Sequence, residues 1–147
     1  MEGDVRLDAL SRRLYATDAS IYEIEPVGVI LPRTTADVVH AVRVAGERGL
    51  SLLPRGGGTS LAGQAVGESL QVDFSRYMNR ILEVDAAGRW ARVEPGVVLD
   101  ELNASLAGKG LMFGPDVSTS SRANLGGMIG NNSCGAHSII HGKTIDH

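Results

Sequence analysis

The chain of 147 residues has little of several things that define other classes of protein. Its single cysteine, Cys134, can form no internal disulfide, and no second cysteine completes a zinc or iron–sulfur motif. It has one Trp, three Tyr and two Phe, and its 14 Lys and Arg form no basic block, which argues against a nucleic-acid-binding surface. No apolar run reaches the ~18 residues of a membrane-spanning helix. The polar, charged N-terminus is unlike a secretory signal, so we expect a cytoplasmic protein.

Apolar patterning predicts an alternation of strands and helices in the first two thirds of the chain. The predicted elements are a helix or arm within residues 1–26, strands at 27–31, 50–54 and 70–74, a hairpin of strands 81–84 and 90–94, and two amphipathic helices. The strand–helix–strand order over residues 27–54 implies a βαβ unit with parallel pairing. The predicted fold class is therefore α+β, with a small mixed sheet, a βαβ unit, a hairpin and two flanking helices.

The two predicted helices have definable ends and faces. Thr34 or Thr35 offers an N-cap for the first helix, and Gly49 a stop. Its apolar side chains are expected to face the core from Val38, Val42 and Ala45, with Val39 alongside. The second helix has an expected core face of Leu99, Leu102 and Leu106, with Gly108 and Gly110 after its end.

Glycine is the residue in excess, with 19 copies gathered mainly in residues 56–67 and 126–142. The run Arg55-Gly56-Gly57-Gly58-Thr59-Ser60 follows a predicted strand. Three successive glycines are entropically costly, and they are expected where a backbone turns tightly or approaches another group closely. The run is either a plain glycine-rich connection or an anion cradle made of backbone N–H groups and the two hydroxyls.

Two common phosphate motifs do not fit this run. Gly58 and Gly63 have the spacing of a P-loop, but the next residues are Gln64 and Ala65, not Lys and Ser or Thr. The dinucleotide fingerprint G-x-G-x-x-G also fails, because Leu61 occupies its third glycine position. The run is therefore an anion cradle of another kind, or no cradle.

A second segment of small polar residues favours a ligand. Residues 115–121 read PDVSTSS and residues 125–135 read LGGMIGNNSCG. Beyond Phe113 the chain has little periodicity, so we expect it to be disordered or shaped around a ligand. Its apolar residues favour the second alternative, namely Leu125, Met128, Ile129, Ile139 and Ile140.

Four stretches together resemble a known family: RGGGTSLAGQ, VEPGVVLDELN, GPDVSTSSRANLGGMIGNNSCG and HGKTIDH. They resemble FAD-linked oxidoreductases of the vanillyl-alcohol oxidase type, which share the PCMH FAD-binding domain. The resemblance is greatest to the branch of D-lactate, glycolate and D-2-hydroxyglutarate dehydrogenases, and the ending is similar to large bacterial members with a C-terminal iron–sulfur region. The resemblance covers residues 27–147 and implies an incomplete FAD-binding domain there, which follows the N-terminal helix or arm of residues 1–26.

Site residues follow from this resemblance. FAD-binding roles are implied for Arg55, Gly56, Gly57, Gly58, Thr59, Ser60, Gly63, Gln64, Pro115, Asp116, Thr119, Gly126, Gly127, Gly130, Asn131 and Ser133. Arg55 could equally be a surface arginine. Covalently linked members often have a histidine where this chain has Thr59, so the resemblance implies non-covalent FAD.

The resemblance also implies the activity and what this chain leaves out. The implied reaction of the full-length protein is hydride transfer from a small-molecule D-2-hydroxy acid to FAD. Further strands, a cap domain and any iron–sulfur cluster would lie in regions that this chain does not include, as would the catalytic residues. The chain alone is expected to be inactive, with apolar surface that could drive self-association. The alternative is a non-catalytic nucleotide- or flavin-binding module. Peripheral membrane association of the full-length protein stays open.

Cysteine and histidine are the other side chains of the chain that could carry chemistry. Cys134 is expected to be a small buried thiol, because no adjacent cation would activate it. His137, His141 and His147 are irregularly spaced, and only Asp146 lies near them as a carboxylate, so no metal site is expected.

Overall fold

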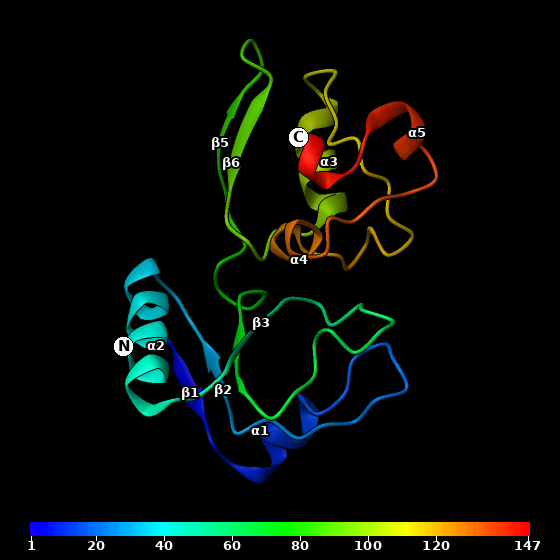
Figure 1. Cartoon of the computed structure of the whole chain (residues 1–147). Helices are drawn as coiled ribbons and strands as arrows, with labels where there is room; N and C mark the ends of the chain where they lie inside the picture. Colours follow the sequence, from blue (N-terminus) through cyan, green and yellow to red (C-terminus); the bar gives the residue numbers. More distant parts are fainter. The chain divides into compact units, whose positions relative to one another are not determined.

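The computed structural model describes all residues from 1 to 147 and divides into two compact units, Met1–Met78 and Asn79–His147. Each unit is described by itself (Figure 1). The first contains β1 (Asp4–Arg6), α1 (Ala9–Leu14), β2 (Gly28–Leu31), α2 (Thr35–Arg48), β3 (Leu52–Arg55) and β4 (Leu70–Asp73). The second contains β5 (Ile81–Asp85), β6 (Trp90–Val93), α3 (Leu99–Ala107), α4 (Leu125–Gly130), α5 (Ser138–His141) and the 3-10 helix η1 (Thr144–Asp146).

A four-stranded mixed sheet in the order β1-β2-β4-β3 organises the first unit. Strand β4 runs parallel to both β2 and β3, and β1 runs antiparallel to β2. The expected direct pairing of the two strands that flank α2 is wrong, because β4 lies between them. Every residue of β2 and β4 is buried, as is typical of central strands that are covered on both faces.

The N-terminal residues, expected to be a helix or arm, form β1 and α1. Helix α2 has the predicted ends: the Thr34 side chain accepts from the Asp37 N–H, and Gly49 takes a left-handed φ of 63°. Its buried face consists of Asp37, Ala41 and Ala45, whereas Val42 is 54% exposed. The expected apolar face is thus only partly correct.

Asp37 occupies that buried face because its carboxylate has backbone donors. It accepts hydrogen bonds from the N–H groups of Glu2, Gly3 and Arg33 at 2.7–3.0 Å. Burial alone would raise the pKa of Asp37, but these N–H groups lower it below the usual value. The carboxylate thereby ties the start of the chain to the start of α2.

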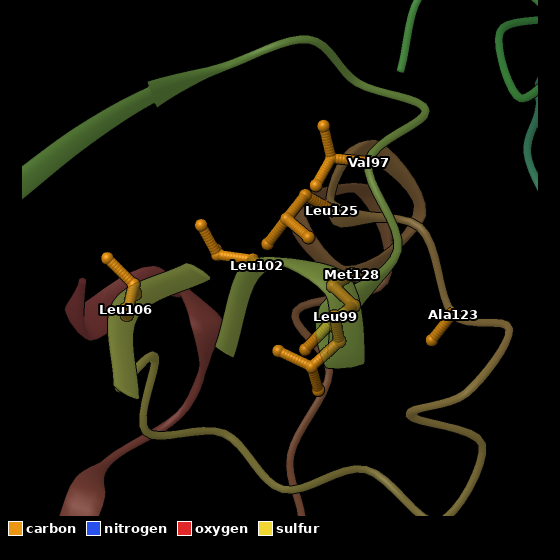
Figure 2. Close-up of a cluster of buried hydrophobic side chains, with 7 residues drawn as sticks. All are labelled: Val97, Leu99, Leu102, Leu106, Ala123, Leu125 and Met128. Atoms are coloured by element: carbon orange, nitrogen blue, oxygen red, sulfur yellow. The ribbon is translucent and has the colours of Figure 1, made fainter. Parts of the chain in front are cut away.

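The second unit is built on a hairpin and a hydrophobic cluster. Strands β5 and β6 pair antiparallel as predicted, with a register irregularity between Ile81 and Glu83. The cluster unites α3 and α4 (Figure 2), and its buried members are Val97, Leu99, Leu102, Leu106, Ala123, Leu125 and Met128. The predicted face of α3 is therefore confirmed.

The segment beyond Phe113 forms three short helical elements instead of a disordered tail. Of its expected core residues, Leu125 and Met128 are buried, whereas Ile129, Ile139 and Ile140 are 70–97% exposed. No helix of the chain is both long and apolar enough to cross a membrane.

Candidate functional site

The first candidate site residues lie in the loop of residues 56–69, which connects the parallel strands β3 and β4. This connection contains no helix. Gly57 and Gln64 are exposed, and Gly56, Gly58, Thr59, Ser60 and Gly63 are half-buried. The loop therefore presents backbone to the surface directly after a sheet strand.

The loop offers backbone N–H groups as hydrogen-bond donors. The N–H groups of residues 56–61 donate to no acceptor within the chain, whereas those of Ala62, Gln64 and Ala65 do. Six consecutive uncommitted donors on a glycine-rich loop are available to an anion with several oxygens. The residues present thus fit a diphosphate group.

Two glycines of the loop have left-handed backbone conformations that the turn requires. Gly58 has φ of 64° and Gly63 has φ of 77°. A Cβ at Gly63 would lie 2.7 Å from the Tyr22 ring. Within the loop, the Ser60 hydroxyl oxygen accepts from the N–H groups of Ala62 and Gln64 at 3.3–3.4 Å, which leaves its own proton available to a ligand.

Arg55, an expected cofactor contact, directs its guanidinium to backbone carbonyls of its own chain. Nη1 donates to the Ala65 carbonyl at 2.7 Å, and Nη2 donates to the Thr17 carbonyl at 2.8 Å. Burial lowers the pKa of Arg55, while nearby Asp73 acts in the opposite direction. The side chain is thus neither a free surface arginine nor an uncommitted cation beside the glycine loop.

The second group of candidate residues lies in the other unit, around Asp116. Its carboxylate accepts from the His137 backbone N–H at 3.0 Å and lies 2.5 Å from His137 Nδ1. These two hydrogen bonds lower the pKa of Asp116 below its usual value, with the imidazole contributing most. Gly135 lies directly against Asp116, where a Cβ would collide with its carboxylate and its carbonyl. Asp116 therefore holds the segment 135–137 in place.

A backbone junction supports the start of α4. Gly126 N–H donates to the Pro95 carbonyl at 2.9 Å, and a Cβ at Gly126 would lie 2.8 Å from Pro95 Cβ. The Asn124 side-chain amide donates to the Gly96 carbonyl at 2.6 Å. Packing within the unit thus explains why residue 126 is a glycine. Pro115 is also buried in this unit.

Other candidate residues of this unit point away from the interior. Gly127 and Gly130 are exposed, and an added Cβ at either would meet no atom within 4 Å. Thr119 is exposed, and the exposed Asn131 caps α4 by donating from its side chain to the Gly127 carbonyl. Ser133 is half-buried, and its carbonyl accepts from the backbone and the hydroxyl of Thr144.

Cys134 is exposed, so the expectation of a buried thiol is wrong. Its loop turns outward because the flanking residues, Ser133 and Gly135, make the contacts with the rest of the unit. No three His, Cys, Asp or Glu side chains lie together in an arrangement that could hold a metal ion.

The second unit also has a hollow of about 540 Å³ beside the hydrophobic cluster. Its walls include Trp90 from β6, Leu106 from α3, Phe113, Ile129 from α4 and His147. Its lining is mixed, because Arg89, His141 and Thr144 lie beside these apolar side chains.

The sequence had singled out most of these residues but not the segment that contacts the glycine loop. Tyr15, Asp18 and Tyr22 all touch the loop or Arg55. Asp18 and Tyr22 lie in a stretch without a clear hydrophobic period, and Tyr15 lies at the end of the expected N-terminal helix or arm, so no sequence signal marked them as loop contacts.

Comparison with known proteins identifies relatives over nearly the whole chain. The family model described as "FAD binding domain" matches residues 26–147. A D-2-hydroxyglutarate dehydrogenase of Pantoea ananatis is 49% identical over 99% of this chain, and the chain spans 14% of that protein. The glycolate oxidase subunit GlcD of Bacillus subtilis is 34% identical over 92% of the chain, which corresponds to 29% of that protein.

Among solved structures, 6-hydroxy-D-nicotine oxidase of Arthrobacter nicotinovorans matches with a TM-score of 0.82 and 26% identity. The match covers 99% of this chain and 32% of that one. These matches confirm the predicted α+β fold class.

Proposed function

Because the chain belongs to the FAD binding domain family, we propose that its glycine loop holds the diphosphate of FAD. Membership confirms the resemblance to FAD-linked oxidoreductases. The observation that carries the proposal is the run of uncommitted N–H groups at residues 56–61. Converging N–H groups offset the two negative charges without a counter-cation, and glycine keeps Cβ atoms out of their way.

The remaining loop residues have complementary roles in this proposal. Gly56, Gly57 and Gly58 supply N–H donors at close approach, and Thr59 and Ser60 add hydroxyl donors. Gly63 and Gln64 close the loop, since Gly63 has the left-handed backbone that its turn requires.

In the second unit, the candidate residues fall into two sets with different proposed roles. Thr119, Gly127, Gly130 and Asn131 form the exposed set that contacts the cofactor. Pro115, Asp116, Gly126 and Ser133 form the packed set that shapes the segment. The carboxylate and serine of this packed set have other partners in the chain.

We further propose that FAD is held without a covalent bond. Thr59 occupies the place where covalently linked members often have a histidine, and a threonine hydroxyl is a poor nucleophile toward a flavin methyl carbon. Acid precipitation of the flavin-loaded chain should therefore release all flavin into the supernatant. Flavin that stays with the pellet would contradict this point.

The relatives' names indicate the activity that the domain serves. They include a D-2-hydroxyglutarate dehydrogenase and a subunit of glycolate oxidase. We propose that the chain is the FAD-binding part of a dehydrogenase acting on a small 2-hydroxy acid. FAD, when bound, accepts the hydride from the carbon that carries the hydroxyl group. This chain's residues bind and orient the cofactor.

FAD titration of the purified chain tests the proposal. Flavin fluorescence should be quenched on binding, and ADP should compete, because ADP carries the diphosphate without the flavin. Riboflavin, which lacks phosphate, should compete poorly. If riboflavin competes as well as ADP does, the glycine loop does not hold the diphosphate. If no FAD binds, the chain is not a cofactor-binding module by itself.

A further inference from the structure

An N-terminal segment, residues 15–22, contacts the glycine loop from outside. It precedes the region matched by the family model, which begins at residue 26. Ala19 N–H donates to the Gly58 carbonyl at 3.0 Å, and the Asp18 carboxylate accepts from Ala65 N–H at 3.2 Å. The segment is thus bonded to the loop near its start and near its end.

Arg55 fastens the same segment from the other side. Its guanidinium donates to the Thr17 and Ala65 carbonyls, with the Tyr15 carbonyl 3.3 Å from Nη1. Gln71, which is fully buried in β4, donates from its side-chain nitrogen to the Tyr15 carbonyl at 3.0 Å. Both Nη groups of Arg55 therefore have acceptors within the chain, and only Nε and the second hydrogen of Nη2 have none.

The position of Gly58 shows how closely the Arg55 guanidinium packs against the glycine loop. A Cβ on Gly58 would lie 2.6 Å from Arg55 Nη2. The absence of a side chain at this position leaves room for the Arg55 guanidinium, and the left-handed φ of 64° independently favours glycine. Gly58 and Arg55 thus form a matched pair.

We infer that residues 15–22 and Arg55 form a brace that preorganises the glycine loop for the cofactor diphosphate. Arg55 and Asp18 are then positioning residues that act through the loop backbone. A phosphate-binding arginine would direct its guanidinium at the ligand, and a carboxylate near a diphosphate would oppose binding by charge repulsion. This inference rests on the proposed function.

Asp18 provides the sharpest test, because the two interpretations predict opposite signs. If Asp18 acts only by charge, Asp18→Ala removes a repulsion and tightens FAD binding. If Asp18 braces the loop, Asp18→Ala frees Ala65 N–H and weakens FAD binding, by about fivefold or more. Asp18→Asn keeps an acceptor oxygen and should restore most of the affinity. Tighter binding by Asp18→Ala, or equal weakening by Asp18→Asn, would overturn the brace.

The role of Arg55 is tested by measuring the FAD affinity of a conservative variant and the dependence of that affinity on salt concentration. Arg55→Lys keeps the charge but cannot reach several carbonyls at once, so FAD binding should weaken about tenfold. The dependence of its dissociation constant on salt should stay that of the wild type. Arg43→Lys, on the exposed side of α2, is the matched control and should change neither. Near-wild-type affinity of Arg55→Lys would show that Arg55 acts as a simple cation and would overturn the inference.

Amide hydrogen exchange of the ligand-free chain separates this inference from the proposed function. In Arg55→Lys, exchange should accelerate at Ala19 and Ala65, while amides away from the loop, such as that of Leu50, which donates to the Ala45 carbonyl, keep their rates. Acceleration throughout the unit, or none, would contradict a local brace. If the wild type binds no FAD but this local pattern appears, the proposed function fails while the loop-holding role stands.

Discussion

Gly127 lies on the exposed side of α4, where an added Cβ would meet nothing within 4 Å. Packing within the chain therefore does not require glycine there, in contrast to Gly126, which lies against Pro95. The fold does not need glycine at this position, but the proposal places Gly127 against FAD. A substitution there should therefore change the stability of the chain and its affinity for FAD in opposite directions.

Gly127→Ala should stabilise the chain by about 0.5–1 kcal/mol, because alanine is the better helix former. FAD affinity should nevertheless fall, because the new methyl group intrudes where the cofactor approaches. Thermal unfolding and FAD titration measure the two effects. Gly46→Ala, in α2 with equally open surroundings, is the control and should stabilise without affecting FAD. Unchanged FAD affinity in Gly127→Ala would remove Gly127 from the site.

Asp116 makes a second prediction at the residue scale. Its pKa is lowered from 3.8 by the hydrogen bonds from His137. A carboxyl group whose folded pKa is depressed stabilises the fold above its unfolded pKa, and this contribution is lost as the pH falls through the folded pKa. Segment 135–137 should therefore loosen only in strong acid, below pH 3.8.

A carboxyl NMR titration measures this directly. His137→Ala should move the pKa of Asp116 up toward 3.8, because the imidazole contributes most to the shift. Ser118→Ala, at an exposed position two residues after Asp116, should leave the pKa of Asp116 unchanged. The same Asp116 pKa in the wild type and in His137→Ala would show that the imidazole is not its partner.

At the scale of elements, the hydrophobic cluster between α3 and α4 holds the second unit together. Leu102 is 3% exposed within it, whereas Leu82 in β5 is 51% exposed. Leu102→Ala should destabilise the unit by about 2–5 kcal/mol, because it removes buried methyl groups and leaves a cavity. Leu82→Ala should cost less than about 1 kcal/mol.

Trp90 fluorescence during urea unfolding measures this effect, because the only tryptophan belongs to the second unit. A cost below about 1 kcal/mol for Leu102→Ala would mean that the cluster does not stabilise α3.

Prediction from sequence succeeded where local signals act alone. The cap at Thr34, the stop at Gly49 and the Leu99–Leu102–Leu106 face depend on neighbours within the same helix, so their spacing is readable. The position of β4 between β2 and β3 depends on long-range pairing, which alternation of apolar residues does not encode. The buried face of α2 was misjudged for a related reason: Asp37 is buried because distant N–H groups from Glu2 and Gly3 satisfy its charge.

The candidate site divides in the same way. The glycine loop could be singled out from its composition, because three successive glycines after a strand are costly, but composition alone left a plain connection and an anion cradle as alternatives. The brace of residues 15–22 could not, because its contacts go mostly to backbone atoms of the loop. Arg55 was predicted as a possible anion contact, because a sequence does not tell whether a guanidinium donates to backbone carbonyls or to phosphate oxygens.

At the scale of the whole molecule, the chain spans 14% of the D-2-hydroxyglutarate dehydrogenase that it resembles. The proposed roles of this chain's residues all concern the cofactor. We therefore expect the chain to bind FAD but not to turn over. Anaerobic addition of D-2-hydroxyglutarate, D-lactate or glycolate should leave the absorbance of bound flavin unchanged. Bleaching by any of the three would show that substrate-contacting groups lie within these 147 residues.

The exposed isoleucines and the apolar part of the hollow also matter at this scale. The hollow of about 540 Å³ and Ile139, which is 97% exposed, leave apolar surface uncovered in the second unit. A two-stranded hairpin such as β5–β6 is also marginal by itself. We propose that this surface lets two copies of the chain associate at high concentration.

The central claim is that the glycine loop holds the FAD diphosphate, and Gly57→Val tests it most directly. Gly57 is exposed in the middle of the run of uncommitted N–H groups. A branched side chain there should obstruct the approach of phosphate oxygens while leaving the fold intact by circular dichroism. FAD titrations should show binding to the wild type and to the control Gly46→Val, and no measurable binding to Gly57→Val. Equal FAD affinity in all three would contradict the assignment of this loop.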